Sequence, residues 1–173
     1  GGPGKFRGAP AYIRQYRMLG EDTVVVMRSD RRNFLPYGLD GGSPGTPSWN
    51  LINPGPNQRV LPVMPMEAVR FARDEIFCHI GAGGGGHGDP LERDVQLVRD
   101  DVREERVTRI YAETVYGVVF ISGTLDVDDD ATIGKRAELR ARPSISRPAY
   151  LEIFHDSLGI ETFELVGERY LKV

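Results

Sequence analysis

Residues 81–94 have the sequence Gly-Ala-Gly-Gly-Gly-Gly-His-Gly-Asp-Pro-Leu-Glu-Arg-Asp, in which a glycine run leads directly into a helix start. Glycine has no Cβ, so residues 83–86 can adopt positive φ and can let another backbone or a ligand approach closely. Asp89 is predicted as the N-cap, Pro90 as the first helical residue and Glu92 as the partner in a capping box. This stretch therefore predicts a loop that enters the N-terminus of a helix.

Two roles are open for this glycine loop. A helix N-terminus offers free N–H groups and a positive dipole end, so the loop could cradle a phosphate. The Walker pattern, however, ends in Gly-Lys-Ser/Thr, whereas this loop lacks the lysine and places acidic residues where a pyrophosphate would lie. The residues alone favour a tight crossing between chain segments. The residues concerned in either role are Gly83, Gly84, Gly85, Gly86, His87 and Asp89.

Three blocks of the sequence follow one another in a recognisable order. They are residues 1–8 (Gly-Gly-Pro-Gly-Lys-Phe-Arg-Gly), residues 28–32 with 36–42, and residues 83–94 with 115–119 (Val-Tyr-Gly-Val-Val). Together they resemble the C-terminal signature of the hydantoinase B family. That family groups the B-type chains of ATP-dependent hydantoinases with the matching half of 5-oxoprolinase and with subunits of acetone and acetophenone carboxylases. His87 departs from the resemblance, because a Tyr or Trp is expected there.

The resemblance also has implications for partners and cofactors. Family members are several times longer, and the acidic and histidine-bearing blocks associated with their metal site precede the first block. The chain is therefore expected to be the C-terminal portion, or a small split subunit, of an ATP-dependent complex that hydrolyses cyclic amides or carboxylates ketones. The expected partners are the N-terminal part of hydantoinase B and a hydantoinase A-like subunit. ATP and a divalent metal are expected in those partner subunits, and no cofactor is expected to bind this chain alone.

The substrate and the role of the chain stay open at this point. Hydantoin, 5-oxoproline, another lactam and a ketone are all compatible with the three blocks. A purely structural assembly subunit with no catalytic residue is the alternative to a chain that forms one wall of the active site. An independent small hydrolase would need a nucleophile paired with a base, and the sequence contains no recognisable pair of this kind.

The composition limits the class of protein further. A chain of 173 residues with 40% hydrophobic residues is long enough for one domain with a core. The net charge is −3 and the arginines alternate with acids, so a nucleic-acid partner is not expected. An apolar run near the ~20 residues of a membrane-spanning helix is missing, so membrane association is not expected either. The single Cys78 excludes an internal disulfide and agrees with a cytoplasmic location.

The hydrophobic pattern predicts a single α+β domain over residues 1–143, with a loop-rich, strand-bearing N-terminal half. Strands are expected at residues 12–18, 23–27, 75–80 and 118–121, and the three consecutive valines of the second indicate a strand buried on both faces. Residues 40–65 are expected to form a long loop whose core contact is Trp49 with Leu51 and Ile52.

Two or three short surface helices are expected to follow. After Pro90 one apolar stripe has the spacing of a helix face, formed by Leu91, Val95, Val98 and Val102. Thr108 is predicted to cap a second helix that ends before Gly117, and a third is predicted from Asp128 until Pro143. Residues 144–173 are expected as a C-terminal extension, with an edge strand at residues 160–166.

The candidate catalytic residues lie in one polar cluster directly after the valine strand. They are Arg28, Asp30, Arg31 and Arg32. Three arginines within five residues could clamp a carboxylate or a phosphate through bidentate hydrogen bonds. They could equally form structural ion pairs, because charge runs are usually solvated or structural.

A metal site is not predicted within this chain. The series Asp126-x-Asp128-x-Asp130 begins like a calcium loop but lacks the glycine and the glutamate that the later positions require. His87 and Asp89 supply only two ligands. His79 lies on a predicted strand that leaves its direction open, and Cys78 is expected to be a small core residue.

Overall fold

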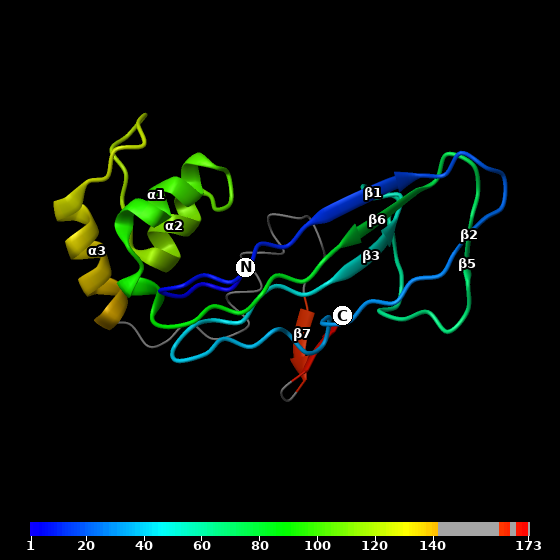
Figure 1. The fold of residues 1–173 in the computed structure, drawn as a ribbon, viewed down its shortest axis with the longest axis horizontal. Coiled ribbons are helices and arrows are strands. Elements are labelled where there is room, and N and C mark those ends of the chain that lie inside the picture. Colours follow the sequence, from blue (N-terminus) through cyan, green and yellow to red (C-terminus); the bar gives the residue numbers. More distant parts are fainter. Residues whose placement is uncertain (142–162, 167–168, 173) are drawn as a thin grey trace.

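The computed structural model describes residues 1–141, 163–166 and 169–172. In this part of the chain, the antiparallel strands between residues 13 and 80 lie at one end of the molecule, three α-helices lie at the other, and long extended segments join them (Figure 1). The strand-bearing half precedes the helices in the sequence. The predicted α+β class and single small domain are therefore confirmed.

The main sheet has four antiparallel strands in the order β1-β6-β3-β4. These strands are β1 (Ile13–Arg17), β6 (Ile76–Ile80), β3 (Trp49–Ile52) and β4 (Arg59–Val60). The predicted strands at residues 12–18 and 75–80 correspond to β1 and β6. The register aligns Arg14, His79 and Asn50 across three strands, so these residues lie on one face of the sheet.

The strand β3 corrects the prediction that residues 40–65 form only a loop. All four of its residues are buried, and Trp49 and Leu51 pack with Cys78 and Ile80 in one cluster. The predicted core contact is confirmed for Trp49 and Leu51, but Ile52 packs in a second cluster with Met18, Phe71 and Phe77. Trp49, Leu51 and Ile52 all belong to a central strand. Only four residues lie between turns that are rich in proline and glycine. This is too few to show the alternating hydrophobic pattern that indicates a strand.

The valine strand forms a separate two-stranded ribbon. β2 (Thr23–Val25) pairs only with β5 (Val69–Phe71) among the described strands. The prediction of burial on both faces is wrong, because Val24 is 50% exposed and Val26 is 76% exposed. A ribbon of two strands covers only one face, where Val25 packs near Phe71 and Ile52.

The first helix starts later than the sequence predicts. Asp89 accepts a hydrogen bond from Leu91 N (2.8 Å), but it caps only the 3-10 turn η1 (Pro90–Glu92). The α-helix α1 (Val95–Arg103) begins after a second cap, Asp94. Glu92 forms an ion pair with Lys5 in place of the predicted capping box.

The remaining helices agree with the sequence more closely. Thr108 caps α2 (Arg109–Tyr116), which ends at Gly117 in the left-handed conformation (φ 64°). Asp128 accepts from Ala131 N at the start of α3 (Asp129–Ala141). The helical end has its own core, formed by Val98, Ala112, Tyr116 and Val118.

Two further strands are predicted in the second half of the chain, and the structure contains only one of them among the described residues. Residues 118–121 are not a strand, since they show only an isolated bridge between Phe120 and Val127. In the C-terminal extension, β7 (Phe163–Val166) pairs with β8 (Arg169–Lys172) as a hairpin, so a strand is present where the sequence predicts one. The predicted helix stop at Pro143 lies outside the described residues.

Candidate functional site

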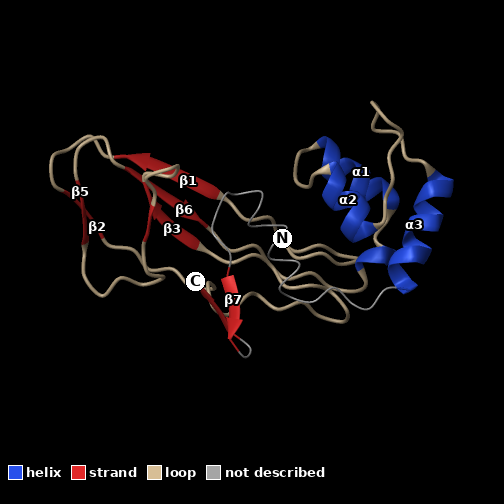
Figure 2. Cartoon of the chain, turned by 180° about the vertical axis from the view of Figure 1, so that it is seen from behind, coloured by secondary structure: helices blue, strands red, loops and turns tan. Residues whose placement is uncertain are grey.

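Three glycine-rich segments lie side by side between the sheet and the helices. Residues 1–8, 36–45 and 83–88 form this glycine bundle, which is drawn in tan in Figure 2. Each pair of segments is joined by backbone hydrogen bonds, among them Gly2 N to Gly84 O (2.7 Å), Ser43 N to Pro3 O (2.8 Å) and Leu39 N to Gly86 O (2.9 Å). The predicted tight crossing between chain segments is therefore confirmed.

The close approach of these backbones explains why the segments need glycine. A Cβ on Gly85 would lie 1.9 Å from Tyr37 O, and a Cβ on Gly86 would lie 2.0 Å from Pro3 O. Positive φ occurs at Gly88 (74°) but not at residues 83–86, so the freedom of glycine to adopt it is not used there. These residues pass between two neighbouring segments and do not form a tight turn, so the missing Cβ is needed for packing and not for backbone conformation.

The bundle also decides between the two roles of the loop. A phosphate cradle needs several free backbone N–H groups that point at one place. Here five of the six N–H groups of residues 83–88 donate to protein acceptors instead, and the donors are Gly83 (to Thr46 Oγ1), Gly84 (to Ala9 O), Gly86 (to Ser43 O), His87 (to Phe6 O) and Gly88 (to Leu39 O). The loop is thus a packing element and has no phosphate cradle of this kind.

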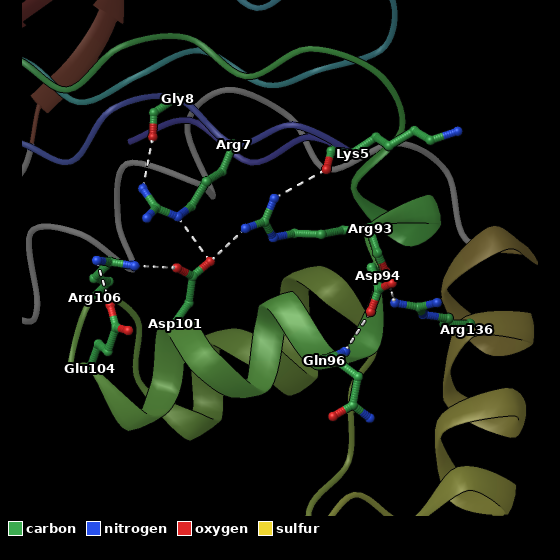
Figure 3. Close-up of polar contacts among 10 residues, drawn as sticks. All are labelled: Lys5, Arg7, Gly8, Arg93, Asp94, Gln96, Asp101, Glu104, Arg106 and Arg136. Atoms are coloured by element: carbon green, nitrogen blue, oxygen red, sulfur yellow. Dashed lines mark hydrogen bonds and ion pairs between the residues drawn. The ribbon is translucent and has the colours of Figure 1, made fainter.

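A buried carboxylate joins the bundle to the helices. Asp101 of α1 has a side chain only 3% exposed. Its Oδ2 accepts from Arg7 Nε at 2.8 Å and from Arg93 Nη2 at 2.9 Å, and Arg106 Nη1 lies 3.5 Å from Oδ1 (Figure 3). Arg7 lies in the first bundle segment and Arg93 follows η1. We call Asp101, Arg7, Arg93 and Arg106 the aspartate hub.

The hub extends to the third helix through Arg93. Its Nη1 donates to Lys5 O (3.1 Å), and its own carbonyl accepts from Arg136 Nη2 (2.7 Å). Arg136 of α3 also donates through Nε to Tyr116 O (3.1 Å). Hydrogen bonds from guanidinium groups therefore connect the glycine bundle with α1, α2 and α3.

Charge explains why Asp101 stays ionised in this place. Burial raises the pKa of its carboxyl, but the hydrogen bonds and positive charges of Arg7 and Arg93 outweigh burial, so the pKa lies below its ordinary value. Removing one partner of a buried ion pair leaves an uncompensated charge, which costs far more than the pair contributes when it is intact. The aspartate hub therefore holds the helices in place against the glycine bundle, and the guanidinium groups of its arginines are bonded to acceptors within the protein.

Sequence reasoning missed this hub, although a signal was present. Asp101 lies three residues after Val98 and directly before Val102, on the border of the apolar stripe of α1. An acid in such a position is expected to find a cationic partner from another element. The sequence does not reveal which arginine, because Arg7 and Arg93 are 86 positions apart in the chain.

The structure separates the four candidate catalytic residues. Arg32 turns into the fold, where Nε donates to Ser48 O (3.3 Å), Nη1 donates to Leu61 O (2.8 Å), and the guanidinium lies over the Trp49 ring. Burial lowers the pKa of Arg32 to about 10. Its contacts are those of a structural residue.

The other three members of the cluster lie at the surface. Arg31 has positive φ (68°), and its Nε lies 3.8 Å from the Asp30 carboxylate. Arg28 is exposed. The structure does not assemble a three-arginine clamp, and a role of Arg28 or Arg31 toward a substrate stays a prediction.

His79 has a defined direction that the sequence could not give. Its Nδ1 is hydrogen bonded to Oδ1 of the fully buried Asn50 at 2.8 Å, and its ring lies 5.6 Å from that of Tyr12. Burial and the charge of Arg14 lower the pKa of His79. These two effects favour the neutral form of the imidazole, which lies within the sheet as a hydrogen-bonding side chain.

Other candidate ligands are dispersed. Within the described residues, no group of three or more His, Cys, Asp or Glu side chains is placed to share a metal ion. Cys78 is buried in the sheet core, as predicted, and burial raises the pKa of its thiol. His87 is exposed beside Phe6, and Asp89 is engaged as a cap.

None of the described helices is long and apolar enough to cross a membrane.

A glycine bundle joined to helices through a buried aspartate defines this chain as an α+β domain organised around close backbone packing. Residues 1–90 match the sequence model of the Hydantoinase B/oxoprolinase family, and the chain belongs to that family. The predicted resemblance is thereby confirmed.

Curated relatives are much longer than this chain. The beta chain of the caprolactamase of Pseudomonas jessenii is 44% identical over 145 residues, which are 79% of this chain and 24% of that protein. The acetone carboxylase alpha subunit of Xanthobacter autotrophicus is 33% identical over 110 residues, or 61% of this chain and 14% of that protein. The B-type chain of a putative D-/L-hydantoinase from a Pseudomonas species is 28% identical over 131 residues, or 75% and 22%. The chain spans less than a quarter of these relatives.

Two solved structures share the fold. The ATP-dependent caprolactamase of Pseudomonas jessenii superposes with a TM-score of 0.63 at 24% identity, over 78% of this chain and 24% of that chain. Nucleotide-free acetone carboxylase superposes with a TM-score of 0.56 at 20% identity, over 91% of this chain and 26% of that chain. At these identities the likeness is one of fold.

Proposed function

We propose that this chain is part of an ATP-dependent complex that opens a cyclic amide, in which it supports an active site assembled with partner subunits. The observation that carries the proposal is the 44% identity to the beta chain of caprolactamase over 79% of the chain. The acetone carboxylase alpha subunit is less similar, at 33% over 61%. A lactam is therefore favoured over a ketone as the substrate class.

The partners in this proposal are the remaining part of a hydantoinase B-type subunit and a hydantoinase A-like subunit. Three of the relatives are named as subunits of an enzyme, which supports a multi-subunit assembly. ATP and a divalent metal would bind to those partners, and the complex would be cytoplasmic. The chain itself would supply the rigid bundle and the hub, with Arg28 and Arg31 available at the surface.

Activity of the complete complex tests the proposal. The full-length subunit that contains this chain is purified with its A-like partner, and ADP release and ring opening are measured with caprolactam, hydantoin, 5-oxoproline, and acetone with bicarbonate. We expect ATP-dependent ring opening of at least one cyclic amide. ATP hydrolysis that responds only to acetone with bicarbonate would move the chain to the carboxylases, and turnover by residues 1–173 alone would contradict a shared active site.

A purely structural assembly role is the second candidate. It is favoured by the hub and by Arg32, whose guanidinium groups face protein acceptors. Arg31→Ala in the complete complex separates the two roles, because the Arg31 side chain forms a long ion pair of 3.8 Å to its neighbour Asp30, and the backbone hydrogen bonds of Arg31 are kept in the variant. Lost turnover in an intact complex supports a wall of the active site, whereas unchanged turnover supports assembly alone.

A further inference from the structure

One edge of the main sheet is exposed and has no neighbouring strand among the described residues. β1 is the terminal strand of the four-stranded sheet, and every residue from Ile13 to Arg17 is exposed. Ile13 is 57% exposed and Tyr16 is 51% exposed. Figure 1 shows β1 along the outer side of the sheet, beside β6 alone. An exposed edge strand of this kind is a template for pairing with another strand.

The outward hydrogen-bonding groups of β1 can be identified from the register. Tyr12 O accepts from Gly81 N, and Met18 N donates to Glu75 O, so the even-numbered residues of β1 face β6. Backbone groups alternate in direction along an antiparallel strand. The N–H and C=O groups of Ile13, Gln15 and Arg17 therefore point away from the sheet, and they have no backbone partner among the described residues.

The charge of the edge is unbalanced. Residues 12–19 contain Arg14 and Arg17 and no acid. Neither arginine forms an ion pair within the part of the chain that the structure describes, whereas other exposed arginines such as Arg59 and Arg70 pair with Glu75 and Asp22. A partner strand with acidic side chains would complement this edge.

We propose that β1 pairs with an extended strand, carrying apolar and acidic side chains, from the remaining part of the hydantoinase B-type subunit. The identity of this occupant rests on the proposed function. Three quarters of the length of the caprolactamase beta chain lies outside the region matched by this chain, so such a strand has a source. A second copy of β1 fits less well, because it would place four arginines on two short strands without an acid between them.

Hydrogen exchange of single amides tests the pairing directly. Exchange is compared between residues 1–173 alone and the same residues within the full-length subunit, with resolution of each amide. We expect the amides of Ile13, Gln15 and Arg17 to be protected at least tenfold more in the full-length subunit. The inward amides of Arg14 and Tyr16 serve as a folding control, because they bond to β6 and should be protected in both.

A pair of variants in the full-length protein confirms the source of protection. Gln15→Pro removes an outward N–H and leaves the backbone bonds to β6 intact, while Gln15→Ala keeps that N–H. Both variants lose the hydrogen bond from Gln15 Nε2 to Cys78 Sγ of β6, so the two are matched in this respect. Gln15→Pro should abolish the added protection of Ile13 and Arg17 and preserve that of Arg14 and Tyr16, whereas Gln15→Ala should change neither.

Two results would overturn the proposal. One is equal exchange of the outward amides in both proteins. The other is protection that rises with the concentration of residues 1–173 alone, since it would identify a second copy as the occupant. These outcomes do not depend on turnover, so a full-length protein without lactam-opening activity could still confirm the pairing, and an active one could refute it.

Discussion

Replacing Gly85 with alanine tests the packing of the glycine bundle most sharply. The new Cβ would lie 1.9 Å from Tyr37 O, whereas Cβ contacts below 3.0 Å essentially do not occur. One of the two backbones must therefore move by about 1 Å, which as overpacking costs ~1–3 kcal/mol. The Tyr37 segment is held by Gly45 N to Pro36 O and Leu39 N to Gly86 O, and losing one such bond adds ~1 kcal/mol. We expect Gly85→Ala to lower the free energy of unfolding by about 2–4 kcal/mol.

Two matched substitutions calibrate this value. At Gly84 the nearest atom to a Cβ is Ala9 N at 3.1 Å, so Gly84→Ala requires only a small adjustment and should cost less than about 1 kcal/mol. At Gly134, within α3, a Cβ meets nothing within 4 Å. Gly134→Ala should stabilise the chain by ~0.5–1 kcal/mol, because alanine favours helix.

Urea unfolding of the three variants provides the measurement. Trp49 fluorescence reports on the sheet and circular dichroism reports on the helices, so loss of the bundle can be distinguished from loss of either end. The predicted order of stability is Gly134→Ala above wild type, then Gly84→Ala, then Gly85→Ala. If Gly85→Ala unfolds at the same urea concentration as wild type, the backbones do not approach as closely as described and the reasoning fails.

Three further predictions concern single polar residues. Asp101→Asn should cost ~3–5 kcal/mol of unfolding free energy because it leaves buried guanidinium groups unpaired. Since the folded pKa of Asp101 is depressed, its contribution is complete above the ordinary value of 3.8 and should be lost as pH falls below it, with a smaller acid sensitivity in the variant. Asp89→Ala should cost ~0.5–1 kcal/mol in thermal unfolding, Asp89→Ser should recover it, and ATP affinity of the complex should not change. Arg32→Lys should cost ~1–3 kcal/mol because one ammonium cannot span Ser48 O and Leu61 O, whereas Arg31→Ala should stay within ~0.5 kcal/mol.

Helix ends could be predicted from the sequence because their signals are local. Thr108 and Gly117 lie at the two ends of α2 as their cap preferences require, and Asp128 starts α3. The first helix deviates because two caps compete within six residues, Asp89 and Asp94. The turn after Asp89 ends at Arg93, which has an extended backbone, and the α-helix begins only after Asp94. Sequence preference alone could not rank the two caps.

Burial of strands could not be predicted because it depends on long-range pairing. The valines of β2 have the composition of a buried strand but pair in a ribbon with one covered face. In contrast β3 has a short and ordinary sequence and lies in the centre of the sheet, between β6 and β4. Neighbouring strands decide burial, and those neighbours lie far away in the sequence.

The candidate site shows the same division between local and distant information. The sequence identifies the arginines at residues 28–32 as one polar cluster. Only the structure shows that Arg32 packs against Trp49 as a structural residue, whereas Arg28 and Arg31 are exposed. The aspartate hub could not be predicted from the sequence, because the two arginines that bind the Asp101 carboxylate, Arg7 and Arg93, lie far apart in the chain.

The three sequence blocks that indicate the family come together in the glycine bundle and the aspartate hub. Each block contributes one segment of the glycine bundle, and the first and third also supply Arg7 and Arg93 to the carboxylate of Asp101. A segment that passes within hydrogen-bonding distance of two others tolerates almost no side chain, which accounts for the glycines without any ligand. These blocks therefore carry information about packing, and that is why they match relatives named for lactam hydrolysis and for ketone carboxylation alike. On the proposed function, substrate choice is then expected to depend on residues outside the bundle, such as the exposed Arg28 and Arg31, and not on the glycine loop.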